Sequence, residues 1–110
     1  QIVSPELLIL DNGLKIKLLG VKEKADKREE TIRFIREKTK GQKVFLKFDT
    51  YKFDEENNLL CYLYLQNKTF LNFHLIKNGL VDVDTNLDYK YKEKFLKISN
   101  NMLNKLSLSS

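Results

Sequence analysis

Two groups of residues have types that suit acid–base chemistry, and neither group is complete. Asp82 and Asp84 lie two positions apart, a spacing that would suit paired carboxylates on a strand or loop. No third acid or histidine accompanies them in register, so we interpret the pair as an exposed turn or helix cap. His74 is the only histidine, and it lies between Phe73 and Leu75 in an apolar segment. We therefore expect His74 to be a structural or surface residue rather than a general base.

Glycine and cysteine point to no cofactor site. The four glycines are dispersed and form no phosphate-cradling loop. A single cysteine excludes an internal disulfide and a cysteine-based zinc site, and it fits a reducing, cytoplasmic compartment. Cys61 lies in an apolar segment and is predicted to be a small core residue. We expect neither a bound metal nor any other cofactor.

Lysines and aromatic residues together supply a different chemistry, the recognition of nucleic acid. A net charge of +5 permits contact with phosphate polyanions, although a lysine-rich surface can also serve solubility alone. Single strands bind where bases stack on exposed aromatic rings within a basic groove. The candidates for such contacts are Lys15, Lys17, Lys22, Lys47, Tyr51, Lys52 and Phe53. For Tyr62 and Tyr64 we favour packing on a neighbouring helix.

The length of 110 residues predicts one domain with one hydrophobic core, placed at 1–105, and a tail at 106–110 that frays. No apolar stretch approaches the roughly 18 residues that span a bilayer, so we expect a soluble domain without membrane contact. The chain begins at Gln1 rather than Met and carries no signal-peptide pattern. We therefore expect a fragment of a larger protein.

Short apolar and alternating segments predict β-strands around a single core. Strands are predicted at residues 7–10, 14–18, 43–49 and 59–65. The first two form a hairpin around a tight turn, and the last two flank an exposed acidic turn at 54–58. Residues 1–3 are all that remains for a first strand, which we expect to be truncated.

Capping and stop signals predict two helices between these strands. Asp26, with a glutamate three residues on, has the form of an N-cap pair, and Gly41 supplies a stop. This pattern predicts a helix over 26–40. Asn72 is predicted to cap a shorter helix that ends at Gly79.

Apolar residues at spacings of four, three and four predict a last helix with one buried face, capped by Asp88 or Asn86. These residues are Tyr91, Phe95, Ile98 and Met102. Lys90, Lys94 and Lys97 are predicted to form a cationic stripe on the opposite face, which a solvated helix surface explains equally well. The order of strands and helices predicts a mainly-β α+β fold, a five-stranded OB-type barrel with two or three helices.

Three segments resemble the staphylococcal-nuclease-like (thermonuclease) family. Residues 15–21, K-I-K-L-L-G-V, resemble the strand V-R-L-x-G-I-D of that family. Residues 54–65 are similar to its hairpin strand D-x-Y-G-R-x-L-A-Y-V-Y-L, and residues 71–81 resemble the helix V-N-x-x-L-V-x-x-G-L-A. The resemblance runs over 4–83 and implies the same OB-type barrel.

Nucleases of this family are understood to hold calcium with acidic residues, to orient water with a glutamate and to neutralise phosphate with two arginines. Carried over by position, the metal-binding aspartate, first arginine, second aspartate, base glutamate and second arginine fall on Glu6, Lys17, Lys22, Ala25 and Asn58. The position of the base glutamate therefore carries no acid, unless Glu23 takes its place in a shifted register.

These replacements predict that the domain is not a nuclease. Lys17 keeps a positive charge without the planar fork of arginine. Lys22 would place an ammonium near the metal, where like charges about 4 Å apart repel by several kcal/mol at an effective dielectric near 20. Asn58 removes the second cation altogether. The activity of the parent protein is left open.

The resemblance implies a catalytically inactive accessory domain that helps a larger nucleic-acid-acting protein to hold DNA or RNA. Similar domains are appended to DNA methyltransferase-type enzymes and to Tudor-containing RNA regulators. The main alternative is a protein-interaction or structural domain that contacts other domains of the parent chain. A rewired metal-dependent nuclease is the third hypothesis.

Overall fold

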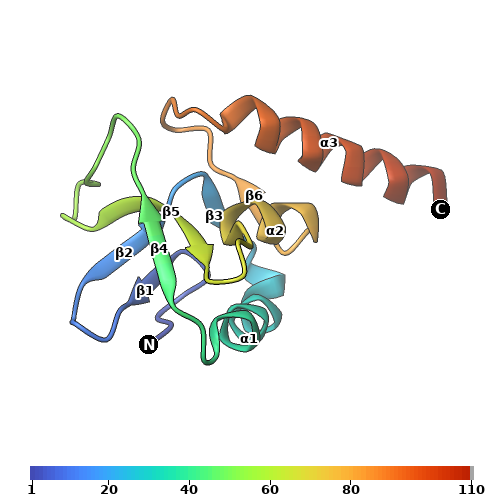
Figure 1. Ribbon diagram of the computed structural model, residues 1–110. Helices are drawn as coiled ribbons and strands as arrows, with labels where there is room; N and C mark the ends of the chain where they lie inside the picture. The colour runs from blue at the N-terminus through green and yellow to red at the C-terminus, as the bar shows by residue number, and fades with distance from the viewer. Residues whose placement is uncertain (110) are drawn as a thin grey trace.

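The computed structural model describes the backbone of residues 1–109 and the side chains of residues 1–101. Within this part of the chain, six strands form two sheets with helices around them (Figure 1). The strands are β1 Leu7–Ile9, β2 Lys15–Leu18, β3 Val21–Glu23, β4 Val44–Lys47, β5 Leu59–Leu65 and β6 Val81–Val83. The helices are a 3-10 turn at Ala25–Lys27, α1 Arg28–Thr39, α2 Leu71–Lys77 and α3 Lys92–Ser109.

The larger sheet has the strand order β1-β2-β5-β4. The hairpin β1–β2 is antiparallel, as the sequence predicts, and β4–β5 is a second antiparallel pair. Strand β2 pairs with β5 in parallel, which requires a crossover that α1 and β4 supply. Strands β3 and β6 form a separate antiparallel pair. This α+β arrangement confirms the predicted OB-type fold class.

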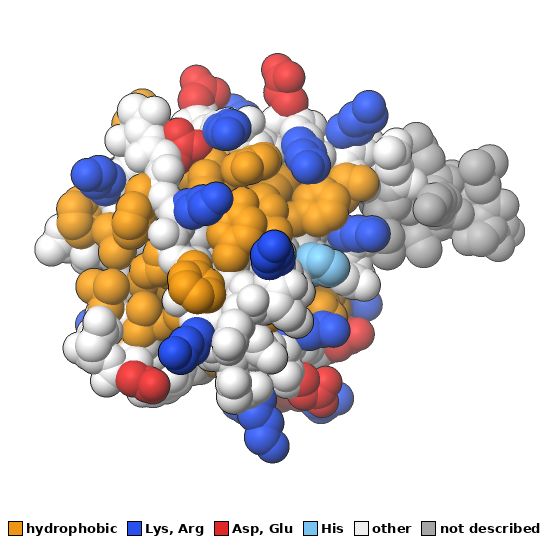
Figure 2. Space-filling view, in the orientation of Figure 1, with side chains coloured by type: hydrophobic (Ala, Val, Ile, Leu, Met, Phe, Trp, Pro, Cys, Tyr) orange, Lys and Arg blue, Asp and Glu red, His pale blue; other side chains and the backbone are white. Residues whose placement is uncertain are grey.

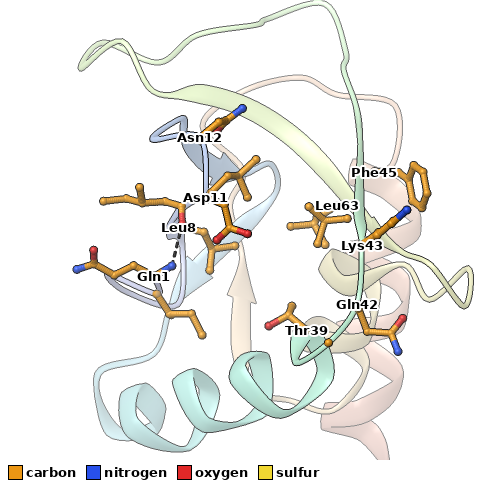
Figure 3. Close-up of a pocket in the computed structure, with 14 residues that line it drawn as sticks. Gln1, Leu8, Asp11, Asn12, Thr39, Gln42, Lys43, Phe45 and Leu63 are labelled. Carbon is orange, nitrogen blue, oxygen red and sulfur yellow. Dashed lines mark hydrogen bonds between the residues drawn. The ribbon is translucent and has the colours of Figure 1, made fainter.

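The first strand is reduced to a single bridge, and the large sheet is open beside it. Ile2 forms a β-bridge with Leu8, while the terminal ammonium of Gln1 donates to the carbonyl of Ile9 over 2.8 Å. Between this edge and β4 lies a groove of about 730 Å³, bordered by the end of α1 (Figure 3). Leu63 of β5 lines it, and Phe45 on β4 is 53% exposed beside it.

Helix α3 contacts the rest of the domain through the face that its spacing predicts. Phe95 is 0% exposed, and Tyr91 and Ile98 are half-buried against the core. Gly20 makes room for this contact: a Cβ there would lie 2.8 Å from the Phe95 ring, and its φ of +82° favours glycine. Met102 lies outside the residues whose side chains are described.

The backbone of α3 is helical to Ser109, beyond the point at which the sequence pattern ends. Residues 106–109 are therefore helical where a fraying tail was expected, and the fraying itself stays a prediction. Asp88, predicted together with Asn86 as a possible cap of α3, accepts a hydrogen bond from the Lys92 ammonium at 3.1 Å, and the cap itself stays a prediction. No helix in the described part of the chain has the length and apolar character needed to cross a membrane.

The two other predicted caps are wrong. The helix over 26–40 is present, but it begins through a 3-10 turn and Asp26 makes no capping hydrogen bond. Asn72 lies inside α2 and is 0% exposed, so it cannot cap the helix. Its Oδ1 accepts from Leu63 N at 2.9 Å, and its Nδ2 donates to the carbonyls of Leu19 and Cys61 at 2.9 and 3.2 Å.

The prediction for Cys61 is confirmed, whereas the predicted turn is found at Asp84 but not at Asp82. Cys61 is fully buried, as predicted, and burial raises the pKa of its thiol to about 12. Asp82 lies on strand β6, not in a turn, with its carboxylate 3.8 Å from the Lys24 ammonium. Asp84 does hold a turn, because its Oδ1 accepts from Asn86 N at 3.0 Å.

Candidate functional site

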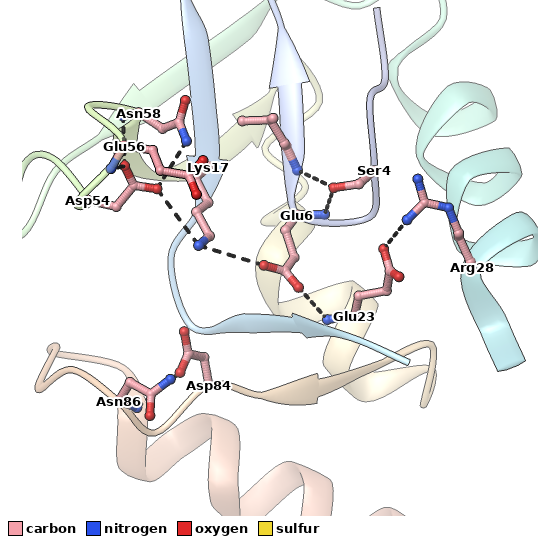
Figure 4. A network of polar contacts seen from close by, with 11 residues as sticks. Ser4, Glu6, Lys17, Glu23, Arg28, Asp54, Glu56, Asn58, Asp84 and Asn86 are labelled. Atoms are coloured by element: carbon pink, nitrogen blue, oxygen red, sulfur yellow. Dashed lines mark hydrogen bonds and ion pairs between the residues drawn. The ribbon is translucent and has the colours of Figure 1, made fainter. Parts of the chain in front are cut away.

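Three of the residues at predicted nuclease positions lie close together near the ends of β1, β2 and β5 (Figure 4). Glu6 immediately precedes β1, Lys17 lies on β2 and Asn58 immediately precedes β5. The Lys17 ammonium lies 3.8 Å from Glu6 Oε1 and 3.7 Å from Asp54 Oδ2. We call Glu6, Lys17, Asp54 and Asn58 the Lys17 cluster. It consists of one cation between two carboxylates.

Asn58, predicted to stand at the position of the second arginine, is hydrogen-bonded within the turn before β5. It is 7% exposed, its Nδ2 donates to Asp54 Oδ2 at 3.0 Å, and its backbone N–H donates to Asp54 Oδ1 at 2.8 Å. Burial alone would raise the pKa of Asp54. The hydrogen bonds from Asn58 and Glu56, together with the charge of Lys17, outweigh burial and hold that pKa below its usual value.

The remaining predicted nuclease positions lie on β3 and in the 3-10 turn that follows it. Ala25 is exposed in the 3-10 turn and has no functional group. Glu23, the substitute base in the shifted register, is paired with the Arg28 guanidinium, and its backbone N–H donates to Glu6 Oε2 at 2.8 Å. Lys22 is exposed on β3, across from Asp82 of β6.

These residues do not fit a calcium ion. Calcium takes six to eight oxygen ligands, most often from carboxylates. Here the carboxylates of Glu6 and Asp54 both face the Lys17 ammonium, so a fixed positive charge already lies between them. Among the described residues, no three Asp, Glu, His or Cys side chains gather in a metal-binding arrangement.

The structure brings only three of the predicted nucleic-acid contacts into one pocket. Lys17, Tyr51 and Phe53 line a cavity of about 430 Å³, with Tyr51 49% and Phe53 56% exposed. Its walls also include the carboxylates of Asp54, Glu55, Glu56 and Asp84. The pocket therefore combines exposed aromatic rings with a surplus of acidic side chains, which repel phosphate.

The other predicted contacts lie outside this pocket. Lys15 shares a strand face with Lys17, whereas Lys52 lies in the loop that leads to β5. Lys22 is on β3, in the smaller sheet. Lys47 on β4 extends over the ring of Tyr64, with its ammonium 5.0 Å from the ring centroid.

Tyr62 and Tyr64 contact aromatic residues at the starts of α2 and α3, as predicted. Tyr62 is 3% exposed and meets the rings of Phe70 and Tyr91 edge to face. Tyr64 stacks on Phe70, with the ring centroids 4.6 Å apart. Burial, together with a 2.6 Å hydrogen bond from its hydroxyl to Asp49, raises the pKa of Tyr62.

The prediction that Lys90 and Lys94 lie on the face opposite Tyr91 is wrong. Their ammonium groups lie 5.5 and 5.9 Å from the centroid of the Tyr91 ring. Lys94 also lies 5.2 Å from the centroid of Phe73. Residue spacing gives the direction of the Cβ atoms only, and long lysine side chains fold back over neighbouring rings.

The fold and the location of the Lys17 cluster define an OB-type, nuclease-like domain. The profile of the family described as staphylococcal nuclease homologue matches residues 15–105, most of the chain. The chain therefore belongs to the staphylococcal nuclease homologue family. A search of curated proteins finds no match to it.

Proposed function

We propose that this domain is catalytically inactive and helps a larger nucleic-acid-acting protein, such as a cytoplasmic DNA methyltransferase, to hold DNA or RNA. The observation that carries the proposal is the Lys17 ammonium between the carboxylates of Glu6 and Asp54. The Lys17 ammonium supplies, from within the chain, the positive charge that a nuclease of this family takes from a metal ion.

Loss of catalysis follows from the transition state that phosphodiester cleavage requires. Charge that develops on the phosphate needs fixed cations, and removing one such group commonly costs about a hundredfold to a thousandfold in rate. Asn58 is neutral and bonded to Asp54, and Lys17 is engaged by two carboxylates. Glu23 is paired with Arg28 and is not free to activate water.

Retention of binding is supported by the family and by charge. Members of a nuclease family are built around a surface that meets nucleic acid, and the chain carries a net charge of +5. Contacts between lysines and phosphates depend little on sequence and weaken as salt rises. We therefore expect weak, sequence-independent binding.

Two measurements on the purified domain test the proposal. Incubation with single-stranded and duplex substrates plus calcium or magnesium should give no cleavage. Cleavage that a chelator abolishes and Glu6→Ala removes would contradict the loss of catalysis. Fluorescence anisotropy with a labelled oligonucleotide should give a log-log salt slope of roughly −0.7 for each contacted phosphate of a single strand. Absence of binding at low salt would contradict the binding role.

A protein-interaction role is the second candidate, and the open groove between β1 and β4 favours it. Strand β4 is an edge strand of the larger sheet and carries the exposed side chain of Phe45, and such an edge is a common place for another chain to add. This role becomes the better explanation if the domain binds no oligonucleotide at low salt.

A further inference from the structure

We propose that single-stranded nucleic acid binds on a surface to which none of the predicted nuclease positions contributes, which we call the aromatic platform. It consists of the rings of Tyr64, Phe70, Phe73 and Tyr91 with the ammonium groups of Lys47, Lys90 and Lys94 above them. This inference rests on the proposed nucleic-acid-binding function and names the surface that performs it.

The rings form a continuous and partly accessible cluster. Phe70 stacks on Tyr64 at 4.6 Å with an interplanar angle of 15°, and on Phe73 at 6.4 Å with an angle of 21°. Tyr91 meets Phe70 at 5.2 Å. All four side chains are half-buried, so each has part of its surface open to solvent. Bases of a single strand stack on such rings regardless of sequence.

Lysines from three segments lie above these rings. Lys47 comes from β4, Lys90 from the loop before α3 and Lys94 from the first turns of that helix. Their ammonium groups lie 5.0 to 5.5 Å from the nearest ring centroids, which are those of Tyr64, Tyr91 and Phe73. Contacts of ammonium groups with exposed rings are weak, so these cations can turn to a phosphate.

The charge around the platform favours a polyanion. Figure 2 shows hydrophobic side chains gathered over β4, β5, α2 and the start of α3, with Lys and Arg among them and acidic side chains mostly near the margins of the view. The carboxylate of Asp49 lies beside Lys90, but it accepts hydrogen bonds from Tyr62 Oη and from the backbone N–H of Lys90. On α2, burial and the charges of Lys77 and Lys38 lower the pKa of His74.

The pocket beside Lys17 lacks this balance of charge. Tyr51 and Phe53 are exposed there, yet four carboxylates share its walls and its lysine is paired with two carboxylates. Phosphates approaching those rings would meet net negative charge. On the platform, by contrast, partly accessible rings and lysines coincide. Duplex DNA keeps its bases stacked internally, so the proposed ligand is a single strand.

Fluorescence anisotropy with labelled single-stranded DNA and RNA oligonucleotides and a labelled duplex tests the platform. The double variant Lys47→Gln/Lys94→Gln should bind a single strand at least tenfold more weakly at low salt, and its salt slope should fall by roughly 1.4. The matched control Arg33→Gln/Lys40→Gln removes the same charge from exposed positions on α1 and directly after it, and should change binding less than threefold.

A second measurement reports stacking directly. The chain has five tyrosines and no tryptophan, so its emission comes from tyrosine and should be quenched by a bound strand. Tyr64→Leu should lower single-strand affinity about tenfold. Urea unfolding checks that this variant folds. If the variant does not fold, the lysine pair and its matched control decide the question.

The outcomes separate the two proposals. If the native domain binds no oligonucleotide, the proposed function fails and the platform fails with it. If native binding is present but the lysine pair and its control weaken it equally, the platform alone is wrong. Tighter binding of the duplex, or equal binding of labelled polyglutamate, would overturn base stacking on the platform.

Discussion

Lysine has opposite roles in two regions of this domain. In the Lys17 cluster, a partly buried ammonium is shared by two carboxylates and holds the starts of β1 and β5 to β2. On the aromatic platform, the ammonium groups of Lys47, Lys90 and Lys94 lie over aromatic rings. The neighbours of a lysine therefore decide whether its ammonium is paired with carboxylates inside the fold or can contact a ligand.

The comparison also separates the predicted nuclease positions from the proposed binding surface. A nuclease of this family concentrates metal, cations and substrate in one place. In this chain three predicted nuclease positions lie in the Lys17 cluster, one cation with two carboxylates, beside an acidic, aromatic pocket. The half-buried rings with lysines lie over β4, β5, α2 and α3. Four predictions can break or sharpen this contrast.

The largest expected effect is on Phe95, which anchors the platform to the core. Replacing this fully buried ring by alanine should lower the free energy of unfolding by about 3 to 5 kcal/mol, because it removes buried surface and leaves a cavity. Urea unfolding measures the change. Lys97→Gln, at an exposed position of the same helix, is the control and should cost less than about 0.5 kcal/mol. Equal small effects would mean that α3 is not held by its apolar face.

The next effect compares the two kinds of lysine directly. Lys17→Gln should destabilise the domain by about 1 kcal/mol, because Glu6 and Asp54 lose their shared cation. The effect is limited because solvent partly screens these charges. Lys94→Gln should change the free energy of unfolding by less than about 0.5 kcal/mol. Chemical denaturation of the two variants decides the matter, and an equal loss in both would remove the distinction between the regions.

A smaller effect should appear in the dependence of stability on pH. The folded-state pKa of Asp54 lies below that of an unfolded aspartate, which is about 3.9. Its contribution is therefore fully present above the unfolded value and is lost as pH falls through the folded pKa. Urea midpoints between pH 7 and pH 2 should fall less steeply at the acid end for Asp54→Asn. An unchanged acid limb would show that Asp54 is not held ionised by this cluster.

The smallest expected effect is the absence of a reaction. Cys61 is fully buried, and burial raises its thiol pKa to about 12, so the native domain should not react with iodoacetamide near pH 8. Alkylation is measured by mass spectrometry, with the urea-unfolded chain as the positive control. Rapid native labelling would mean that β5, which follows directly on Asn58 and carries Tyr64 of the platform, opens readily.

Patterns local in sequence predicted much of the fold. The hairpin of β1 and β2, strands β4 and β5, and the helix over 26–40 were predicted from alternation, turn residues and helical spacing. The face of α3 was predicted because Phe95 and its neighbours recur at helical intervals. Such signals succeed because the period of an element and the burial of its face are set by residues next to one another.

Caps and contacts that involve remote residues were not predictable in this way. Asn72 has the residue type of a cap, but its actual partners are the backbones of Leu19, Cys61 and Leu63, up to 53 positions away. Asp54 was predicted only as part of an exposed turn, yet it pairs with Lys17 of another strand. Partners of this kind are decided by the packing of strands and helices.

The sequence by itself predicted the OB-type class and the family, because residue identity and spacing carry that information, and both predictions are confirmed. Only the tertiary structure decided what the replacements do. It placed Lys17 between Glu6 and Asp54, and it brought lysines from β4 and α3 over rings from β5 and α2. Charge is a property of a residue, but its availability depends on which groups the fold places within a few ångströms of it.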